Sequence, residues 1–174
     1  HAMYTTGYGL YATRNLSDSE PKWVFFNEGF EQTAVLDLVS PPSGDVYLLS
    51  AIGDRDGFRH EDFSVSPANG HFGSAQKMTM GTCRELDIAW QDPRIVVRVG
   101  NRVQYSHDGG ITWNWFPGES DARGRRGRMN IAVSADGATT VWSWAGGTFY
   151  SQREGDGWSE WAPAEGAPEG MNVV

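Results

Sequence analysis

Cysteine, long apolar runs and positive charge are all scarce in this sequence. The 174 residues contain a single cysteine, Cys83, so no disulfide forms within the chain. No apolar run approaches the roughly 18–20 residues that a membrane-spanning helix needs. The net charge is −8, whereas nucleic acids and anionic membranes attract clustered positive charge. We therefore expect no partner of either kind.

Two further kinds of site find little support in the sequence. His60, His71 and His107 do not have the spacing of metal ligands, so we predict no metal and no cofactor. Cys83 has no activating neighbour in the sequence, and we interpret it as a small buried residue. The basic stretch ARGRRGR (122–128) is interpreted as a solvated loop, with an anion or partner contact as the alternative.

Helical periodicity is also nearly absent. Short apolar runs, rich in β-branched and aromatic residues, are interrupted every few residues by Gly, Pro, Asp or Asn, which is the pattern of strands separated by tight turns. The clearest runs are TAVLDLVS (33–40), DVYLLSAIG (45–53), LDIAW (86–90), RIVVRVG (94–100), MNIAVS (129–134) and TTVWSWAG (139–146). The sequence therefore predicts an all-β fold.

The predicted strands recur along the chain. Residues 87–113 align with residues 130–158, and Tyr105 then falls on Tyr150, 45 residues later. The stretch LDLVSPPSGDVYLLSAIGD (36–54) matches the first two strands of the same unit. A period of about 40–45 residues with four short strands per unit is typical of a β-propeller blade.

We therefore predict a partial β-propeller of about three to four four-stranded antiparallel blades. The expected units are residues 4–32, 33–80, 81–128 and 129–174, and His1–Met3 is interpreted as an expression scar. Single-chain propellers typically have about four to eight blades, so either blades are missing or partial propellers assemble with each other. Because exposed blade edges promote association, we expect a homo-oligomer.

One turn, YSHDGGITW (105–113), carries a dense set of polar residues. Its pattern Ser-x-Asp-x-Gly-x-Thr-Trp resembles an Asp-box, and the Asp can accept hydrogen bonds from its own turn. The motif residues are Ser106, Asp108, Gly110, Thr112 and Trp113. We interpret them as structural, because the copy one repeat later has Arg153 at the Asp position. The turn joins the third and fourth strands of its unit, so we expect ligand-binding loops at the opposite end.

The loop GDRDGFRHED (53–62) is the richest candidate at that opposite end. It contains Asp54 and Asp56, a carboxylate pair of the kind that acts as acid and base in glycoside hydrolysis. The alternative is a polar loop whose Asp and Gly residues only shape the turn. The candidates for substrate binding, which include aromatic rings suited to stacking on sugars, are Phe58, Arg59, His60, Trp115 and Trp144.

Several of these stretches together resemble glycoside hydrolase family 74. They are EQTAVLDLVSPPSG, LLSAIGDRDGFRHEDFSVSP, IVVRVGN, YSHDGGITWNWFPG and IAVSADGATTVWS. The resemblance covers nearly the whole chain and matches the middle of the family's N-terminal propeller. It implies a relationship to secreted, endo-acting xyloglucanases, which are built from two seven-bladed propellers with a cleft between them.

The resemblance places both catalytic carboxylates of the family outside the matched region. Residues 54–58 match the family's Asp-x-Gly-Gly-Phe loop, which echoes the loop of the catalytic base, with Arg55 in place of an apolar residue and Asp56 in place of a Gly. We therefore expect a segment that binds a β-1,4-glucan such as xyloglucan and is catalytically incomplete alone. Two alternatives remain: a self-assembled hydrolase that uses carboxylates of the 53–62 loop, and a non-catalytic scaffold or protein-interaction module.

Overall fold

The computed structural model describes the chain except for residue 8 and residues 29–32, 119–128 and 168–174. The basic stretch 122–128 thus lies outside the described residues. The described part of the chain forms fifteen strands and no helix, so it offers no helix suited to spanning a membrane. All of its strand pairs are antiparallel. The predicted all-β antiparallel class is confirmed.

The chain divides into two compact units, His1–Ala34 and Val35–Val174. The first unit is a sheet of three strands, β1 (Ala2–Thr6), β2 (Gly9–Thr13) and β3 (Val24–Phe25), paired in that order. Ala2 and Met3 pair with β2, so two of the three residues interpreted as a scar take part in the sheet. The interpretation of His1–Met3 as an expression scar stays a prediction.

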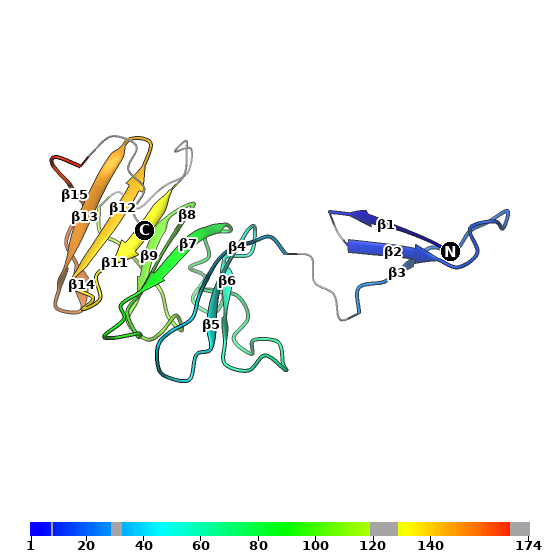
Figure 1. Ribbon diagram of the computed structural model, residues 1–174, viewed down its shortest axis with the longest axis horizontal. Helices are drawn as coiled ribbons and strands as arrows, with labels where there is room; N and C mark the ends of the chain where they lie inside the picture. The colour runs from blue at the N-terminus through cyan, green and yellow to red at the C-terminus, as the bar shows by residue number, and fades with distance from the viewer. Residues whose placement is uncertain (8, 29–32, 119–128, 168–174) are drawn as a thin grey trace. The chain divides into compact units, whose positions relative to one another are not determined.

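The second unit contains three sheets that stand side by side (Figure 1). The first sheet has β4 (Val35–Val39), β5 (Leu48–Ile52) and β6 (Gly57–His60). The second has β7 (Cys83–Ile88), β8 (Val96–Gly100), β9 (Val103–Ser106) and β10 (Asn114–Trp115). The third has β11 (Asn130–Val133), β12 (Thr139–Trp144), β13 (Gly147–Glu154) and β14 (Gly157–Trp158), and β15 (Ala162–Pro163) also pairs with β13. Within each sheet, strands that follow one another in the chain lie side by side, except that β15 pairs with β13.

The first of these sheets departs from the expected four strands. Residues 61–80 follow β6 without forming a strand, and Gly70 and Gly73 in this segment have positive φ angles that an extended strand does not accommodate. The segment instead inserts Phe72 into the core beside Trp113, with 5.0 Å between ring centroids.

The core consists of two apolar layers, one between each pair of neighbouring sheets. The layer between the first and second sheets is formed by Leu49, Ala51, Phe72, Met80, Cys83, Leu86, Ile88, Val96 and Trp113. The layer between the second and third sheets is formed by Ala89, Ile95, Val97, Val99, Val103, Tyr105, Phe116, Met129, Ile131, Val133, Trp142 and Trp158. The second sheet is therefore buried on both faces, as all five residues of β8 indicate.

The first strands of the three sheets are joined by carboxylates as well as by apolar contacts. Asp37 of β4 accepts a hydrogen bond from the Leu86 backbone N–H of β7 at 3.0 Å. Asp87 of β7 accepts one from the Val133 N–H of β11 at 2.8 Å. Burial raises the pKa of Asp87, although the N–H groups of Val133 and Ile88 oppose that rise. These bonds fix the order and spacing of the sheets.

Candidate functional site

The three sheets present their turns at two opposite ends. The turns that join each second strand to its third comprise residues 53–56, 101–102 and 145–146, and we call their side of the molecule the hairpin end. The Ser106–Trp113 turn joins the third strand β9 to the fourth strand β10. It therefore lies at the other end of the second sheet, as predicted from the repeat.

Asp54 is exposed at the hairpin end and has a positive φ of 66°. Its backbone N–H donates to Thr82 Oγ1 at 3.2 Å, and the Thr82 hydroxyl lies 3.5 Å from Asp54 Oδ1. Asn101 in the neighbouring turn donates from Nδ2 to the Met80 carbonyl at 2.7 Å. Residues 80–82 thus link the Asp54 turn to the Asn101 turn through hydrogen bonds. This arrangement suits hydrogen bonding to a hydroxyl-rich ligand.

Asp56, the second predicted carboxylate, is buried, with 1% of its surface exposed. Its Oδ1 accepts the Met80 N–H at 2.8 Å and faces Arg98 Nη1 at 3.3 Å. Its Oδ2 accepts the Gly81 N–H at 3.3 Å. The structure therefore gives Asp56 internal partners, and of the two predicted carboxylates it exposes only Asp54.

Arg98 is the unpredicted member of this arrangement. It lies on β8, is fully buried, and its guanidinium stands 4.1 Å from the ring centroid of Trp113 and 5.2 Å from that of Phe72. Arg98 also donates to the Gln104 side-chain carbonyl. Burial lowers the pKa of Arg98, and the carboxylate of Asp56 acts in the opposite direction. A buried guanidinium needs such an anion and such rings to be tolerated.

Phe58 and His60 were predicted to lie in a loop, but the structure places both in a strand. Gly57–His60 is strand β6, which begins as soon as the turn is complete. The two rings lie on the same face of the sheet, 6.3 Å apart, and the exposed Phe63 lies 6.2 Å from His60. His60 Nε2 is 3.0 Å from the Ser50 hydroxyl, and burial lowers the pKa of His60. These side chains belong to the sheet face that is not covered by the second sheet.

Arg59 lies between Phe58 and His60 in β6, so its side chain points to the other face of the sheet. It reaches the turn after β9, at the end opposite to the hairpin end. Its Nε donates to the Gly109 carbonyl at 3.1 Å, and its guanidinium pairs with Glu61. Both partners of the Arg59 guanidinium are therefore groups of this chain. Successive side chains of a strand point to opposite faces, so Phe58 and His60 lie on one face of the first sheet and Arg59 on the other, and the three do not form one site.

The two candidate tryptophans differ in their surroundings. Trp144 ends β12 at the hairpin end and stacks on Trp142 and on Phe149, with 5.6 Å between centroids in each case. It is half-buried against the second core layer. Trp115 on β10 lies under the guanidinium of Arg102, at 4.7 Å, and Arg102 belongs to the 101–102 turn. Both rings remain partly accessible, so both stay candidates for sugar contact.

The Ser106–Trp113 turn is organised by Asp108. Its Oδ1 accepts the backbone N–H groups of Thr112 at 2.8 Å and Ile111 at 3.1 Å, and its Oδ2 accepts the Thr112 hydroxyl at 2.5 Å. Ser106 donates to Oδ1 at 2.7 Å. Partial burial opposes ionisation, but these donors outweigh it and lower the pKa of Asp108. The carboxylate is fully used by its own turn, which fits the structural interpretation given to the motif.

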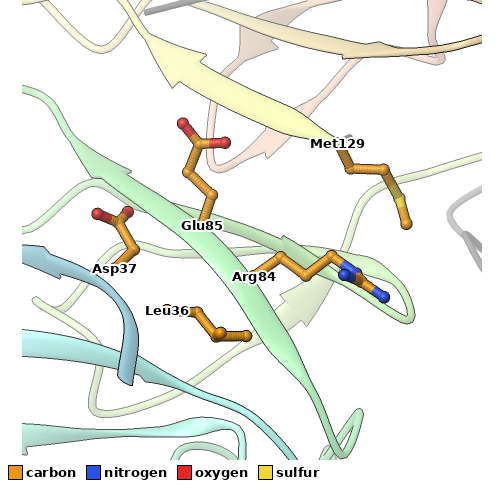
Figure 2. Close-up of a pocket in the computed structure, with 5 residues that line it drawn as sticks. All are labelled: Leu36, Asp37, Arg84, Glu85 and Met129. Atoms are coloured by element: carbon orange, nitrogen blue, oxygen red, sulfur yellow. The ribbon is translucent and has the colours of Figure 1, made fainter. Parts of the chain in front are cut away.

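A separate pocket of about 250 Å³ lies along the first strands of the sheets. It is lined by Leu36, Asp37, Arg84, Glu85 and Met129. Figure 2 shows the Asp37 and Glu85 carboxylates turned to one side and the Arg84 guanidinium turned away from them. Glu85 accepts a hydrogen bond from Asn130 Nδ2 at 2.7 Å, and Asp37 bonds to Leu86. We interpret this pocket as the seam between sheets.

Only some of the side chains at the hairpin end were identified as candidate site residues from the sequence. The sequence singled out Asp54, Trp115 and Trp144, but Thr82 and Asn101 were missed because isolated Thr and Asn residues in turns carry no distinctive pattern. The described residues hold no group of three or more His, Cys, Asp or Glu side chains placed to bind a metal ion. Within the three described turns the available chemistry is therefore that of one exposed carboxylate, the guanidinium groups of Arg55 and Arg102, and neutral hydrogen-bonding groups, with the Trp115 and Trp144 rings beside them.

Known proteins with similar sequences are xyloglucan-degrading enzymes. No protein-family model matches the chain. A xyloglucanase of Paenibacillus sp is 37% identical over 99% of the chain, and an oligoxyloglucan-reducing end-specific xyloglucanase of Emericella nidulans is 32% identical over 82%. The chain spans 17% and 19% of the length of these two relatives.

Solved structures give the same result. The crystal structure of a GH74 xyloglucanase from Xanthomonas campestris matches 91% of the chain and 24% of its own length, with a TM-score of 0.61 and 36% identity. The GH74 enzyme of Niastella koreensis matches 88% of the chain and 21% of its own length, with a TM-score of 0.59 and 31% identity. Over the length that it spans, the chain belongs to glycoside hydrolase family 74 and forms part of a β-propeller.

Proposed function

We propose that the chain binds a β-1,4-glucan such as xyloglucan at the hairpin end, and that it does not hydrolyse the glucan by itself. The similarity to xyloglucanases supports the choice of ligand. Asp54, with Thr82 beside it, supplies hydrogen-bonding groups for sugar hydroxyls. Trp115 and Trp144 supply aromatic faces at the margins of this surface. By the same similarity we expect an extracellular protein.

The burial of Asp56 is the observation that carries the second half of the proposal. Glycoside hydrolysis needs two carboxylates on either side of the bond, separated by about 5–10 Å. The turns of the hairpin end contain two carboxylates, Asp54 and Asp56, both in residues 53–56. Because Asp56 is buried and paired with Arg98, one accessible carboxylate remains there. A single carboxylate cannot act as acid and base at once.

Calorimetric titration with a xyloglucan oligosaccharide that has a cellotetraose backbone tests ligand binding. We expect saturable binding, weakened roughly three- to tenfold by Asp54→Ala, because solvent around the exposed Asp54 screens the hydrogen bond and reduces its contribution to about 0.7–1.4 kcal/mol. Asp136→Ala is the matched control, because Asp136 is an exposed carboxylate in the turn between β11 and β12 at the other end. Absence of binding would favour a scaffold or protein-interaction module.

Reducing-end release from polymeric xyloglucan tests catalytic incompleteness. We expect no release above the level of buffer. Release that disappears in Asp54→Ala would contradict the proposal and favour the alternative, a hydrolase assembled from two or more copies of the chain. Measuring the release over a series of protein concentrations adds a second criterion, because a self-assembled hydrolase gains specific activity as the oligomer forms.

Association of copies has its own support in the structure. Within the second unit, the face and edge of the first sheet that the second sheet does not cover carry Leu36, Leu38, Tyr47 and Phe63, each exposed by more than two-fifths of its surface. Apolar groups exposed in this number on one sheet favour contact with another protein surface. Both a homo-oligomer and further propeller blades would cover them. Light scattering at increasing concentration distinguishes a stable monomer from an associating chain.

A further inference from the structure

We propose that Asp56 and Arg98 act as a buried clamp that positions the Asp54 turn against the Gly81–Thr82 segment. The two residues are 42 positions apart and lie in neighbouring sheets. They do not touch solvent, so they are positioning residues and not ligand contacts. The consequence for ligand affinity rests on the proposed function, whereas the clamp itself rests on the contacts within the chain.

The contacts of Asp56 run from one sheet to the next. Its carboxylate accepts the N–H groups of Met80 and Gly81, and its own backbone N–H donates to the Gly81 carbonyl at 2.7 Å. Three hydrogen bonds thus join one turn residue to the segment that leads into β7. Thr82, which bonds to Asp54, is the next residue of that segment. Because these bonds tie residues 80–82 to the turn that holds Asp54, a shift of residues 80–82 also shifts Asp54.

The backbone of the turn also indicates that the Asp56 side chain is needed. Asp56 has a φ of 57°, in the region where glycine is favoured and other residues are strained. Strain of this kind persists where surrounding contacts fix the conformation. Here those contacts are the two amide N–H groups and the Arg98 guanidinium. The carboxylate thus holds in place a turn that its own backbone disfavours.

Arg98 extends the clamp into the core. Its guanidinium is held over the Trp113 ring on one side and by Gln104 on another, and Gln104 Nε2 donates to the Met78 carbonyl at 2.9 Å. The segment before β7 is therefore bonded at Met78 through Gln104 and at Met80 through Asp56. The charge of Arg98 stabilises the Asp56 carboxylate in the buried site.

Amide hydrogen exchange on Asp56→Asn tests the clamp directly. Asparagine keeps the shape but removes the charge, and we expect exchange at Met80 and Gly81 to accelerate at least about tenfold, because hydrogen bonds to a charged group are lost. Ile88, at the far end of β7, serves as the internal reference and should change much less. Asp45→Asn removes an exposed carboxylate from another turn and should leave all three rates unchanged.

Ligand affinity separates a positioning role from a merely structural one. With the same xyloglucan oligosaccharide, we expect Asp56→Asn to bind about fivefold or more weakly and Asp45→Asn to bind like the wild type, measured where each variant is fully folded. Arg98→Lys, which keeps the charge but not the planar fork, should shift both measurements in the same direction and decides the question if Asp56→Asn fails to fold.

Two results would overturn the proposal. Unchanged exchange at Met80 and Gly81 would refute the clamp, and faster exchange with unchanged affinity would refute its role in positioning the ligand site. If the wild-type chain binds no oligosaccharide, the proposed function fails, and exchange at Met80 and Gly81 still decides whether the clamp exists.

Discussion

Replacing Asp108 by alanine should destabilise the protein by about 2–3 kcal/mol. The carboxylate accepts two backbone N–H groups and two hydroxyl groups within its turn. Hydrogen bonds to a charged acceptor contribute about 1.5–3 kcal/mol in buried sites, and partial exposure of Asp108 reduces that figure for each bond through solvent screening. For a chain of this size the loss corresponds to a fall in Tm of roughly 5–10 °C.

The pH dependence of this effect follows from the lowered pKa of Asp108. Its folded value lies below the ordinary 3.8, so its stabilisation is complete well above that pH and is lost as the pH falls through the folded value. Thermal and urea unfolding, followed by tryptophan fluorescence, should therefore show a large difference between wild type and Asp108→Ala at pH 7. The difference should narrow below pH 3.8.

Asp136→Ala is the matched control for this prediction. Asp136 accepts a hydrogen bond from Ser134 at 2.5 Å and from the Ala138 N–H at 3.0 Å, but it lies in a fully exposed position. Its replacement should lower the Tm clearly less than Asp108→Ala does. Equal losses for the two variants, or a loss at Asp108 that is the same at pH 7 and pH 3, would refute the reasoning.

Three further outcomes are expected. Gly57→Ala should cost more than about 3 kcal/mol in urea unfolding, because a Cβ there would lie 1.9 Å from the Ser50 carbonyl oxygen, whereas Gly44→Ala, with open space around it, should cost about 1 kcal/mol; similar costs would contradict this. Burial raises the pKa of the Cys83 thiol to about 12, so Ellman's reagent at pH 8 should react only after denaturation, and rapid reaction of the native protein would be inconsistent with the structure. Leu38→Glu on the uncovered sheet face should shift any oligomer toward monomer in sedimentation velocity, and an unchanged distribution would mean that another surface mediates association.

The strands and turns were predictable because their causes are local. Runs such as RIVVRVG are short, rich in β-branched residues and end at turn-forming residues, and the hydrogen bonds that Asp108 and Ser106 make within the Ser106–Trp113 turn span at most four residues. The face of each strand was harder to predict. Phe58 and His60 look like loop residues beside the polar run of 53–62, but pairing with β5 makes them part of a sheet.

The clamp could not be predicted from the sequence. Arg98 stands in an apolar run, IVVRVGN, where alternation alone does not say whether its charge is buried or exposed. Its partner Asp56 comes from a turn in another sheet, and their pairing depends on how two sheets pack. Likewise, Thr82 approaches Asp54 only because β7 begins beside the 53–56 turn. Long-range contacts of this kind are set by tertiary packing and leave no periodic pattern in the sequence.

The location of the ligand site is the central claim, and mapping it by two-dimensional NMR tests it most directly. On addition of the xyloglucan oligosaccharide, the amide signals of Asp54, Thr82 and Asn101 should shift in a saturable manner. The signals of Asp108 and Thr112, in the turn at the opposite end, should stay in place. Shifts confined to the Asp108–Thr112 turn, or no shifts at ligand saturation, would contradict the account.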